Sequence, residues 1–155
     1  MNAAMALKVC QKCKASCCKM GGADFSRVEM LKVLNAGYKN FFMKINDNHY
    51  ELKSKKGICP YLARNNSCSI HKCRPLMCQC WPLTINYKSD KKEIMIAKCP
   101  LTPLLSKQDI QIMKKQISRI PKKMLNDTIS CSKLPKSDLK LIQKRLGKFK
   151  KIQLK

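Results

Sequence analysis

The sequence predicts a small α+β protein built around cysteine-rich loops, and three patterns indicate it. Segments with apolar residues at helical spacing alternate along the chain with short, β-prone segments. Eleven cysteines occur in 155 residues, and ten of them lie between Cys10 and Cys99. Prolines beside several of these cysteines keep the surrounding segments out of regular helix. We therefore expect irregular cysteine loops organised by metal, two β-hairpins and flanking helices.

The first helix is expected over residues 27–36. Ser26 followed by Glu29 has the form of a capping box, in which the two side chains satisfy free backbone amides at the start of a helix. Apolar residues then recur at helical spacing, and Gly37 provides an end signal.

Two β-hairpins are expected on either side of the middle cysteines. Residues 41–46 and 49–53 are rich in β-prone side chains and are separated by Asp47-Asn48, a pair that favours a tight turn. A second pair of such segments, 84–87 and 93–97, also flanks a short polar turn. These hairpins would frame the loops that carry the middle cysteines.

A lysine-rich helical extension is expected from residue 106 to the end of the sequence. Ser106 and Asp109 repeat the capping-box pattern at the start of a segment with helical apolar spacing. Cys131 is the one cysteine of the eleven that lies in this part. The sequence thus predicts a cysteine-cluster metal-binding domain over residues 1–105 and a helical extension, residues 106–155, packed on it.

The chain carries a large excess of positive charge. Thirty-three Lys and Arg residues oppose nine Asp and Glu residues, which gives a formal net charge of +24. Such a charge attracts polyanions, although thiolates bound to a metal would offset part of it. In the extension these lysines have two interpretations, the solvated side of amphipathic helices packed on the metal module or a docking face for an acidic protein or RNA partner. The docking face would consist of Lys114, Lys115, Lys122, Lys123, Lys148, Lys150 and Lys151.

Neither a membrane span nor an export signal is expected. The chain has no run of about 18 apolar residues, and residues 1–9 hold only a short apolar stretch broken by Lys8. Disulfide scaffolds need an export route and favour an even number of cysteines. Reduced thiols in the cytoplasm, available to a metal, are therefore the better interpretation.

The first cysteine cluster has a spacing suited to metal binding. Cys10, Cys13 and Cys17 stand at positions i, i+3 and i+7, so a helical or turn-like backbone points their sulfurs to one side. Neighbouring side chains diverge on a helix or strand, so Cys18 either reaches a second metal or closes the site from another side. Lysines around the cluster are expected to lower the pKa values of the thiols.

The remaining motif cysteines fall in loop-like segments, most of which carry proline. Trp81, the sole tryptophan of the chain, either roofs the site and keeps water from the sulfurs or is an ordinary core aromatic. The segments are Cys59-Pro60-Tyr61-Leu62, Cys68-Ser69-Ile70, the stretch from Arg74-Pro75 through Cys78 to Trp81-Pro82, and Cys99-Pro100.

In this order the motifs resemble the YkgJ-type cysteine-cluster family, whose domain is described as chelating zinc or iron. The resemblance covers about residues 8–103. For Arg74 it implies a structural role, in which the guanidinium bonds a carbonyl or a sulfur of the site. It also implies eight metal ligands, which are Cys10, Cys13, Cys17, Cys18, Cys59, Cys68, Cys78 and Cys99.

The chain departs from the family pattern in several places. Lys14-Ala15-Ser16 places three residues between the second cysteine and the adjacent pair, where the family usually has two. His71 stands where the family usually has tyrosine. The sequence leaves open the roles of His71 and of the additional cysteines, which are Cys73, Cys80 and Cys131.

Eight thiolates suit several metal contents: one four-iron cluster with a zinc, two zincs, or two clusters. Zinc ribbons usually present two Cys-x-x-Cys pairs, whereas this chain has one, from Cys10 to Cys13. We therefore expect iron, as an iron-sulfur cluster, in preference to zinc.

The sequence predicts a metal-binding protein with a role in redox, cofactor or metal-handling chemistry. Five glycines, none of them in a G-x-G pattern, argue against a self-contained nucleotide enzyme, so any catalysis would take place at the metal. The alternative is a nucleic-acid-binding module in which zinc is purely structural and lysines contact phosphates.

Overall fold

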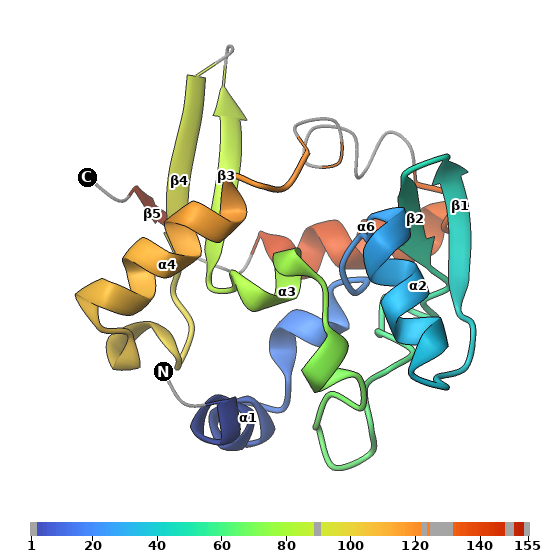
Figure 1. The fold of residues 1–155 in the computed structure, drawn as a ribbon, viewed down its shortest axis with the longest axis horizontal. Coiled ribbons are helices and arrows are strands. Elements are labelled where there is room, and N and C mark those ends of the chain that lie inside the picture. The colour runs from blue at the N-terminus through green and yellow to red at the C-terminus, as the bar shows by residue number, and fades with distance from the viewer. Residues whose placement is uncertain (1–2, 89–90, 122–123, 125–131, 148–150, 154–155) are drawn as a thin grey trace.

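The computed structural model describes residues 3–88, 91–121, 124, 132–147 and 151–153, and it has the α+β architecture that the sequence predicts. Two hairpins stand at opposite sides of the molecule, and the cysteine-bearing segments lie between them (Figure 1). In chain order the elements are α1 (Ala3–Lys12), the 3₁₀ helix η1 (Ser16–Lys19), α2 (Arg27–Asn35), β1 (Phe42–Asn46), β2 (His49–Leu52), η2 (His71–Cys73), α3 (Leu76–Gln79), β3 (Leu83–Lys88), β4 (Lys91–Ala97), η3 (Thr102–Leu104), α4 (Lys107–Ile117), α6 (Lys136–Leu146) and β5 (Lys151–Gln153).

Helix α2 confirms the first predicted helix. The Ser26 hydroxyl accepts the Glu29 amide, and the Glu29 carboxylate accepts the Ser26 amide at 2.8 Å, so the capping box is complete. Gly37 follows the helix with a φ of +82°, a conformation that residues with a side chain rarely adopt. Both end signals in the sequence therefore act as expected.

Both predicted hairpins are present as antiparallel pairs. In the first, Phe42 of β1 lies opposite Leu52 of β2. In the second, Leu83 of β3 lies opposite Ile96 of β4. Each pair places one or more apolar side chains in a core, which fixes the register because a one-residue slip would expose them.

Strand β5 differs from the expectation that the extension is helical to its end. It pairs antiparallel with β4, and Ile152 lies opposite Ile96. The outer edge of β4 presents backbone groups that need partners, and this short segment supplies them. Three residues carry too little periodicity for a strand to be recognised from sequence.

Three apolar clusters form the core. The first lies between α2 and the β1–β2 hairpin around Phe25, the second between the β3–β4 hairpin and α4 around Leu83, and the third beneath α6 around Ile142. The second and third clusters combine residues from before and after position 105, so α4 and α6 pack on the preceding part of the chain. A domain boundary at residue 105 stays a prediction.

Some predictions fall on residues outside the described ranges. They concern Cys131 and four lysines of the predicted docking surface, Lys122, Lys123, Lys148 and Lys150. Lys115 of that surface is exposed on α4. Across the described ranges, no helix combines the length and the apolar character that a membrane span requires.

Candidate metal centre

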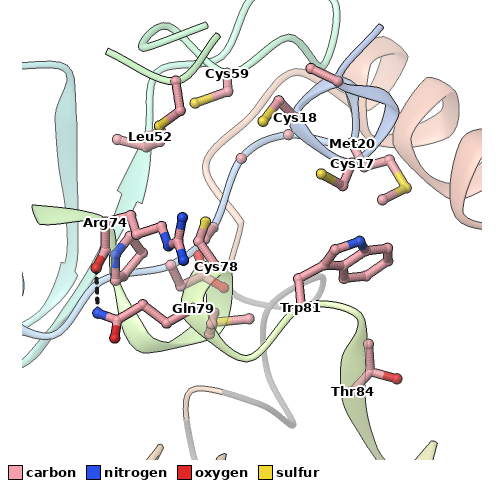
Figure 2. A pocket seen from close by; sticks show the side chains of 18 of the residues that line it. Cys17, Cys18, Met20, Leu52, Cys59, Arg74, Cys78, Gln79, Trp81 and Thr84 are labelled. Carbon is pink, nitrogen blue, oxygen red and sulfur yellow. Dashed lines mark hydrogen bonds between the residues drawn. The ribbon is translucent and has the colours of Figure 1, made fainter. Parts of the chain in front are cut away.

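A cavity of about 380 Å³ is bordered by the ends of both hairpins, by η1 and by α3. Figure 2 shows Cys17, Cys18 and Cys59 along one side of it and Cys78 facing them from α3. The structure thus brings together cysteines that are up to 68 positions apart in the chain, from Cys10 to Cys78. The lining contains six of the eight cysteines implied by the resemblance, Cys10, Cys17, Cys18, Cys59, Cys68 and Cys78.

The first cluster is held by a break between α1 and η1. Lys14 and Ala15 adopt left-handed backbone conformations, with φ of 57° and 48°. The Ala15 amide bonds the Cys10 carbonyl at 2.8 Å, and the Ala15 carbonyl accepts the Cys18 amide at 3.0 Å. The extra residue of this motif is therefore accommodated in a tight turn that returns Cys17 and Cys18 toward Cys10.

Cys17 and Cys18 do not diverge as they would on an α-helix or a strand. They lie in the 3₁₀ helix η1, and a hydrogen bond joins their thiols. Both residues line the same cavity. Their common orientation makes both available to one centre.

Backbone contacts join the second cluster to the first. The Cys59 amide donates to the Cys18 carbonyl at 2.8 Å, which fixes the two motifs side by side. Leu62 lies three residues after Cys59 and forms an isolated β-bridge with Cys68. Short-range structure thus presents Cys59 and Cys68 together.

Cys78 projects from α3, the helix that follows Arg74-Pro75. The Gln79 side-chain nitrogen Nε2 donates to the Arg74 carbonyl at 2.8 Å and secures the start of this turn (Figure 2). Cys78 is exposed and lines the cavity, and desolvation by the surrounding protein raises the pKa of its thiol well above the usual value. Its thiol therefore faces the cavity within a low-polarity environment.

Cys13 and Cys99 lie beside the cavity and do not line it. The Cys13 thiol donates to the Cys10 carbonyl at 3.3 Å. Burial raises the pKa of the Cys99 thiol, and the nearby Cys17 and Cys13 raise it further. These two cysteines are thus close to the other six at the α1 end of the site.

Burial governs the protonation of the thiols. It is the first cause that raises the pKa of Cys10 and of Cys59 to about 11, and neighbouring thiols add to it. The pKa of Cys17 is raised first by its hydrogen bond to Cys18 and then by burial. The expectation that nearby lysines lower these values is wrong, because burial outweighs the effect of charges held in solvent. A metal would have to displace these protons.

The positive charge of Arg74 acts on several of the thiols. Its charge lowers the pKa values of Cys10, Cys68 and Cys78, against the larger effect of burial. Figure 2 shows its guanidinium beside Cys78. Arg74 therefore contributes a positive charge where thiolates would gather. The guanidinium bond to a carbonyl or a sulfur that the resemblance implied stays a prediction, because the hydrogen bond that this group makes among the described residues is to His71.

These positions agree with a comparison of the chain with known families. The model of the CxxCxxCC family, described as a putative zinc- or iron-chelating domain, matches residues 9–102. The chain belongs to the CxxCxxCC family. All eight candidate ligands fall within the matched residues of the CxxCxxCC domain. No curated protein and no solved structure matches the chain.

His71 of the CxxCxxCC domain bonds Arg74. An Arg74 terminal nitrogen donates to His71 Nε2, and burial followed by the Arg74 charge lowers the pKa of this histidine. His71 is therefore neutral at neutral pH, with Nε2 occupied as an acceptor. This arrangement makes His71 a partner of Arg74 and leaves only Nδ1 for any other role.

The additional described cysteines are core residues. Cys73 packs in the first apolar cluster, and Cys80 packs in the second, where its thiol lies 3.8 Å from the Met113 carbonyl. Neither lines the cavity. Trp81 does line it and also packs in the third cluster, so both sequence interpretations of this residue hold in part.

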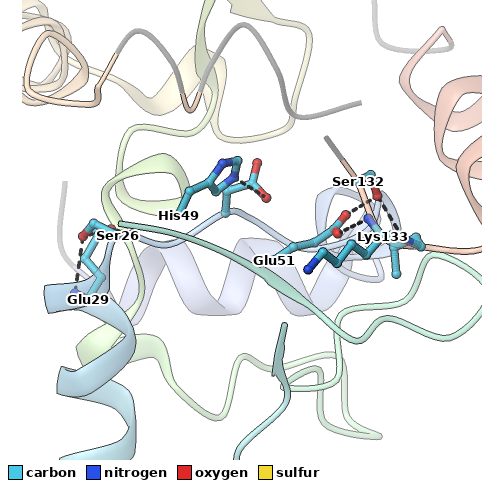
Figure 3. Close-up of polar contacts among 8 residues, drawn as sticks. Ser26, Glu29, His49, Glu51, Ser132 and Lys133 are labelled. Atoms are coloured by element: carbon cyan, nitrogen blue, oxygen red, sulfur yellow. Dashed lines mark hydrogen bonds and ion pairs between the residues drawn. The ribbon is translucent and has the colours of Figure 1, made fainter. Parts of the chain in front are cut away.

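Sequence reasoning missed a buried polar group at the edge of the cavity. His49 Nε2 lies 3.5 Å from an Asp24 carboxylate oxygen, and both residues are largely buried. Glu51, on the same face of β2, accepts the Ser132 hydroxyl and, at 2.9 Å, the Lys133 amide (Figure 3). The i, i+2 placement of His49 and Glu51 was the available signal, but Asp24 joins them only through the fold.

The donor set fits zinc or iron. Soft thiolates select these metals over hard cations such as magnesium and calcium. Among the residues that the structure describes, no three Cys, His, Asp or Glu side chains stand where they could jointly hold an ion. The fit therefore depends on donor chemistry and on the orientation of six cysteines toward one cavity.

Proposed function

We propose that this CxxCxxCC domain binds iron as an iron-sulfur cluster, with four thiolate ligands to a cluster. The ligands come from Cys10, Cys13, Cys17, Cys18, Cys59, Cys68, Cys78 and Cys99, and eight thiolates leave room for a second metal centre. The role of the centre would lie in redox, cofactor or metal-handling chemistry. The observation that carries the proposal is the convergence of six cysteines from separate segments on one cavity. Membership of a family described as zinc- or iron-chelating supports metal binding in general.

Two features favour iron over structural zinc. A structural zinc ion sits in a closed tetrahedral site, whereas these thiols border an open space. Iron-sulfur clusters accept widely and unevenly spaced thiolates. The described cysteines are free thiols, which is consistent with the reducing cytoplasm where we place the protein.

Anaerobic purification of the full chain, followed by iron, zinc and acid-labile sulfide analysis, tests this proposal. We expect iron and sulfide together, with visible charge-transfer absorption. Zinc without sulfide would contradict the cluster, and a chain that holds neither metal after reconstitution would contradict metal binding itself.

Variants of single cysteines locate the metal. Cys59→Ser and Cys78→Ser should weaken metal retention by at least about tenfold and lower the midpoint of thermal unfolding, because ligation supplies folding free energy. Cys131→Ser is the matched control, since it lies outside the family match, and it should keep the parent metal content. Equal metal content and stability in all three variants would defeat the assignment.

A second candidate is a nucleic-acid-binding module with structural zinc, and the small number of lysines paired with carboxylates favours it. Among the described residues, one lysine forms an ion pair with a carboxylate, Lys44 with Asp47 at 2.6 Å. Most of the positive charge is therefore left for an external polyanion. The carboxylates that bond backbone amides instead are Glu29, Glu51, Asp109 and Asp138.

The two candidates differ in salt response. Phosphate contacts make the logarithm of affinity fall linearly with the logarithm of salt concentration. A zinc protein whose RNA binding shows this slope, and loses it when the seven lysines of the extension become glutamine, would favour the second candidate. An iron-sulfur protein without RNA binding at low salt would exclude it.

A further inference from the structure

The cavity is larger than a metal centre requires. Its volume of about 380 Å³ lies within the range of about 300–1,000 Å³ typical of sites for small organic ligands. The aliphatic side chains of the wall offer no ligand to iron, zinc or sulfide, so a metal centre at the thiols would occupy only the part of this space that the cysteines border. Native interiors leave few voids larger than a water molecule. The cavity therefore suits an organic occupant in addition to metal.

A large part of the cavity wall is apolar. It comes from β3, α4 and α6, which lie largely outside the cysteine motifs and whose aliphatic side chains bind no metal. Such a surface favours a hydrocarbon body over water. The side chains of this apolar wall are Leu83, Ile85, Met113, Ile117, Ile142 and Leu146.

Two buried polar atoms belong to residues of the cavity wall and make no hydrogen bond among the described residues. They are Arg74 Nε and Thr84 Oγ1. A buried donor without an acceptor is costly, so native structures normally supply a partner. One terminal nitrogen of the Arg74 guanidinium is already bonded to His71, which holds the group in place and leaves Nε for a different acceptor.

The acidic residues of the wall already have partners. Glu51 accepts the Ser132 hydroxyl and the Lys133 amide, and Asp24 is paired with His49. These contacts direct both carboxyl groups toward protein atoms. Arg74 is therefore the charged group of the wall that is placed to receive a ligand, and a guanidinium bonds anionic oxygens best.

We propose that the cavity binds a small amphipathic organic anion, such as an aryl or alkyl carboxylate or sulfonate, beside the metal. Its apolar body lies between β3, α4 and α6, and its anionic group bonds Arg74. The inference rests on the proposed function only in placing a metal at the thiols. The centre would then act on or respond to a bound molecule and would not be purely structural.

Two fluorescent probes that differ in one group provide the test. N-phenyl-1-naphthylamine is neutral, and 1-anilinonaphthalene-8-sulfonate is the same apolar body with an anionic group. Both should bind the reconstituted full chain at one site, the sulfonate roughly tenfold more tightly because of one charge-assisted hydrogen bond. Absence of saturable binding of either probe would overturn the proposal.

Variants on α4 test the apolar wall. Met113→Trp fills the cavity and should abolish binding of both probes. Ile112→Trp is the matched control and should leave the binding of both probes unchanged. Ile112 precedes Met113 on α4, is 49 % exposed and does not line the cavity. Ile85→Phe on β3 replaces Met113→Trp if that variant does not fold. Unchanged binding in a folded cavity-filling variant would show that the probes bind elsewhere.

Arginine variants test the anionic contact. Arg74→Met should lower affinity for the sulfonate roughly tenfold and leave the neutral probe unaffected. Arg64→Met, at an exposed position, should change neither affinity. Equal affinities for the two probes in the parent, or equal losses for both in Arg74→Met at parent metal content, would overturn the assignment of Arg74.

Metal analysis and thermal unfolding of every sample separate this inference from the proposed function. One outcome is a chain that holds no metal and still binds the probes, while Met113→Trp does not bind them. This outcome would contradict the metal centre and uphold the ligand site. A chain with its full metal content that binds no probe would contradict the ligand site alone.

Discussion

Gly22 is the residue whose missing side chain lets the first cysteine cluster approach the second. Its φ is +86°, and a Cβ atom there would lie 2.9 Å from a Leu52 methyl carbon and 3.5 Å from the Cys59 sulfur. Both the backbone conformation and the space exclude a larger residue. Gly37 has a similar φ of +82°, but a Cβ there would meet nothing within 4 Å.

Comparison of Gly22→Ala with Gly37→Ala should isolate this close approach. Gly37→Ala should cost about 1 kcal/mol of unfolding free energy, the usual penalty of a left-handed alanine, at unchanged metal content. Gly22→Ala carries the same penalty plus the clash, so we expect a larger loss together with weaker metal retention. Chemical unfolding and metal analysis measure both quantities, and equal effects of the two variants would contradict the steric explanation.

Asp24 gives the protein a pH dependence of defined sign. Burial raises the pKa of its carboxyl group above the usual value near 3.8, and the hydrogen bond and charge of His49 oppose this only in part. The folded protein therefore holds the proton more tightly than the unfolded chain does. This stabilisation is complete below about pH 3.8 and is lost as the pH rises through the folded pKa.

Asp24→Asn should remove the loss of stability that the parent shows as the pH rises. The free energy of unfolding of this variant should increase relative to that of the parent as the pH rises from about 3.8, so the variant becomes the more stable of the two by comparison. Asp47→Asn is the control with the opposite sign, because its hydrogen bond and ion pair with Lys44 lower the Asp47 pKa. Urea unfolding across acidic pH measures both differences, and a parallel response of the two variants would refute the assignment.

Among the elements, α2 and α3 are joined by one carboxylate. Glu29 Oε2 accepts the Ser26 amide at the start of α2, while Glu29 Oε1 accepts the Leu76 amide at 2.7 Å, at the start of α3. Helix α3 carries Cys78. A helix of four residues cannot hold its own position, so its first amide is secured from α2.

Glu29→Ala should therefore affect the metal centre as well as α2. Loss of the cap costs about 1 kcal/mol, and the unpaired Leu76 amide costs about 1–3 kcal/mol more. Ser26→Ala, the matched control, removes the hydroxyl cap but keeps the Leu76 contact, and it should retain the parent metal content. Metal loss in Ser26→Ala equal to that in Glu29→Ala would show that α2 stability, rather than the link to α3, controls the site.

At the scale of the whole molecule, α6 closes the structure against the cysteine segments. Added Cβ atoms at Gly21 and Gly57 would lie 2.8 Å and 2.9 Å from Ile142 side-chain carbons, so the helix packs directly on these glycines. An Arg145 terminal nitrogen donates to the Lys19 and Lys56 carbonyls at 2.5 Å and 2.9 Å. A helix near the C-terminus thus contacts both cysteine-bearing regions.

Ile142→Ala should destabilise the whole protein by about 2–5 kcal/mol, because it empties a buried position at this contact. Leu141→Ala, at the neighbouring position with 38 % exposure, should cost less than about 1 kcal/mol. A single cooperative transition shifted in Ile142→Ala indicates one folding unit. A separate early transition would instead support an independent domain ending near residue 105.

Local elements were accessible from the sequence because their signals are local. The capping boxes at Ser26 and Ser106 and the two hairpins use contacts between residues a few positions apart, and the structure confirms them. Strand β5 was missed because its partner β4 lies more than fifty positions earlier in the chain. Propensity says nothing about such a pairing.

The sequence by itself determined the kind of chemistry: cysteine number, motif order and family membership indicate thiolate metal binding. The tertiary structure decided how the thiols are placed, which side chains accompany them and which cysteines are core residues. Cys73 and Cys80 differ from Cys78 in burial and not in spacing, and Arg74 and Asp24 meet the site through contacts distant in sequence. Burial and charge in a folded protein depend on what surrounds a residue in space, and the sequence alone does not specify those neighbours.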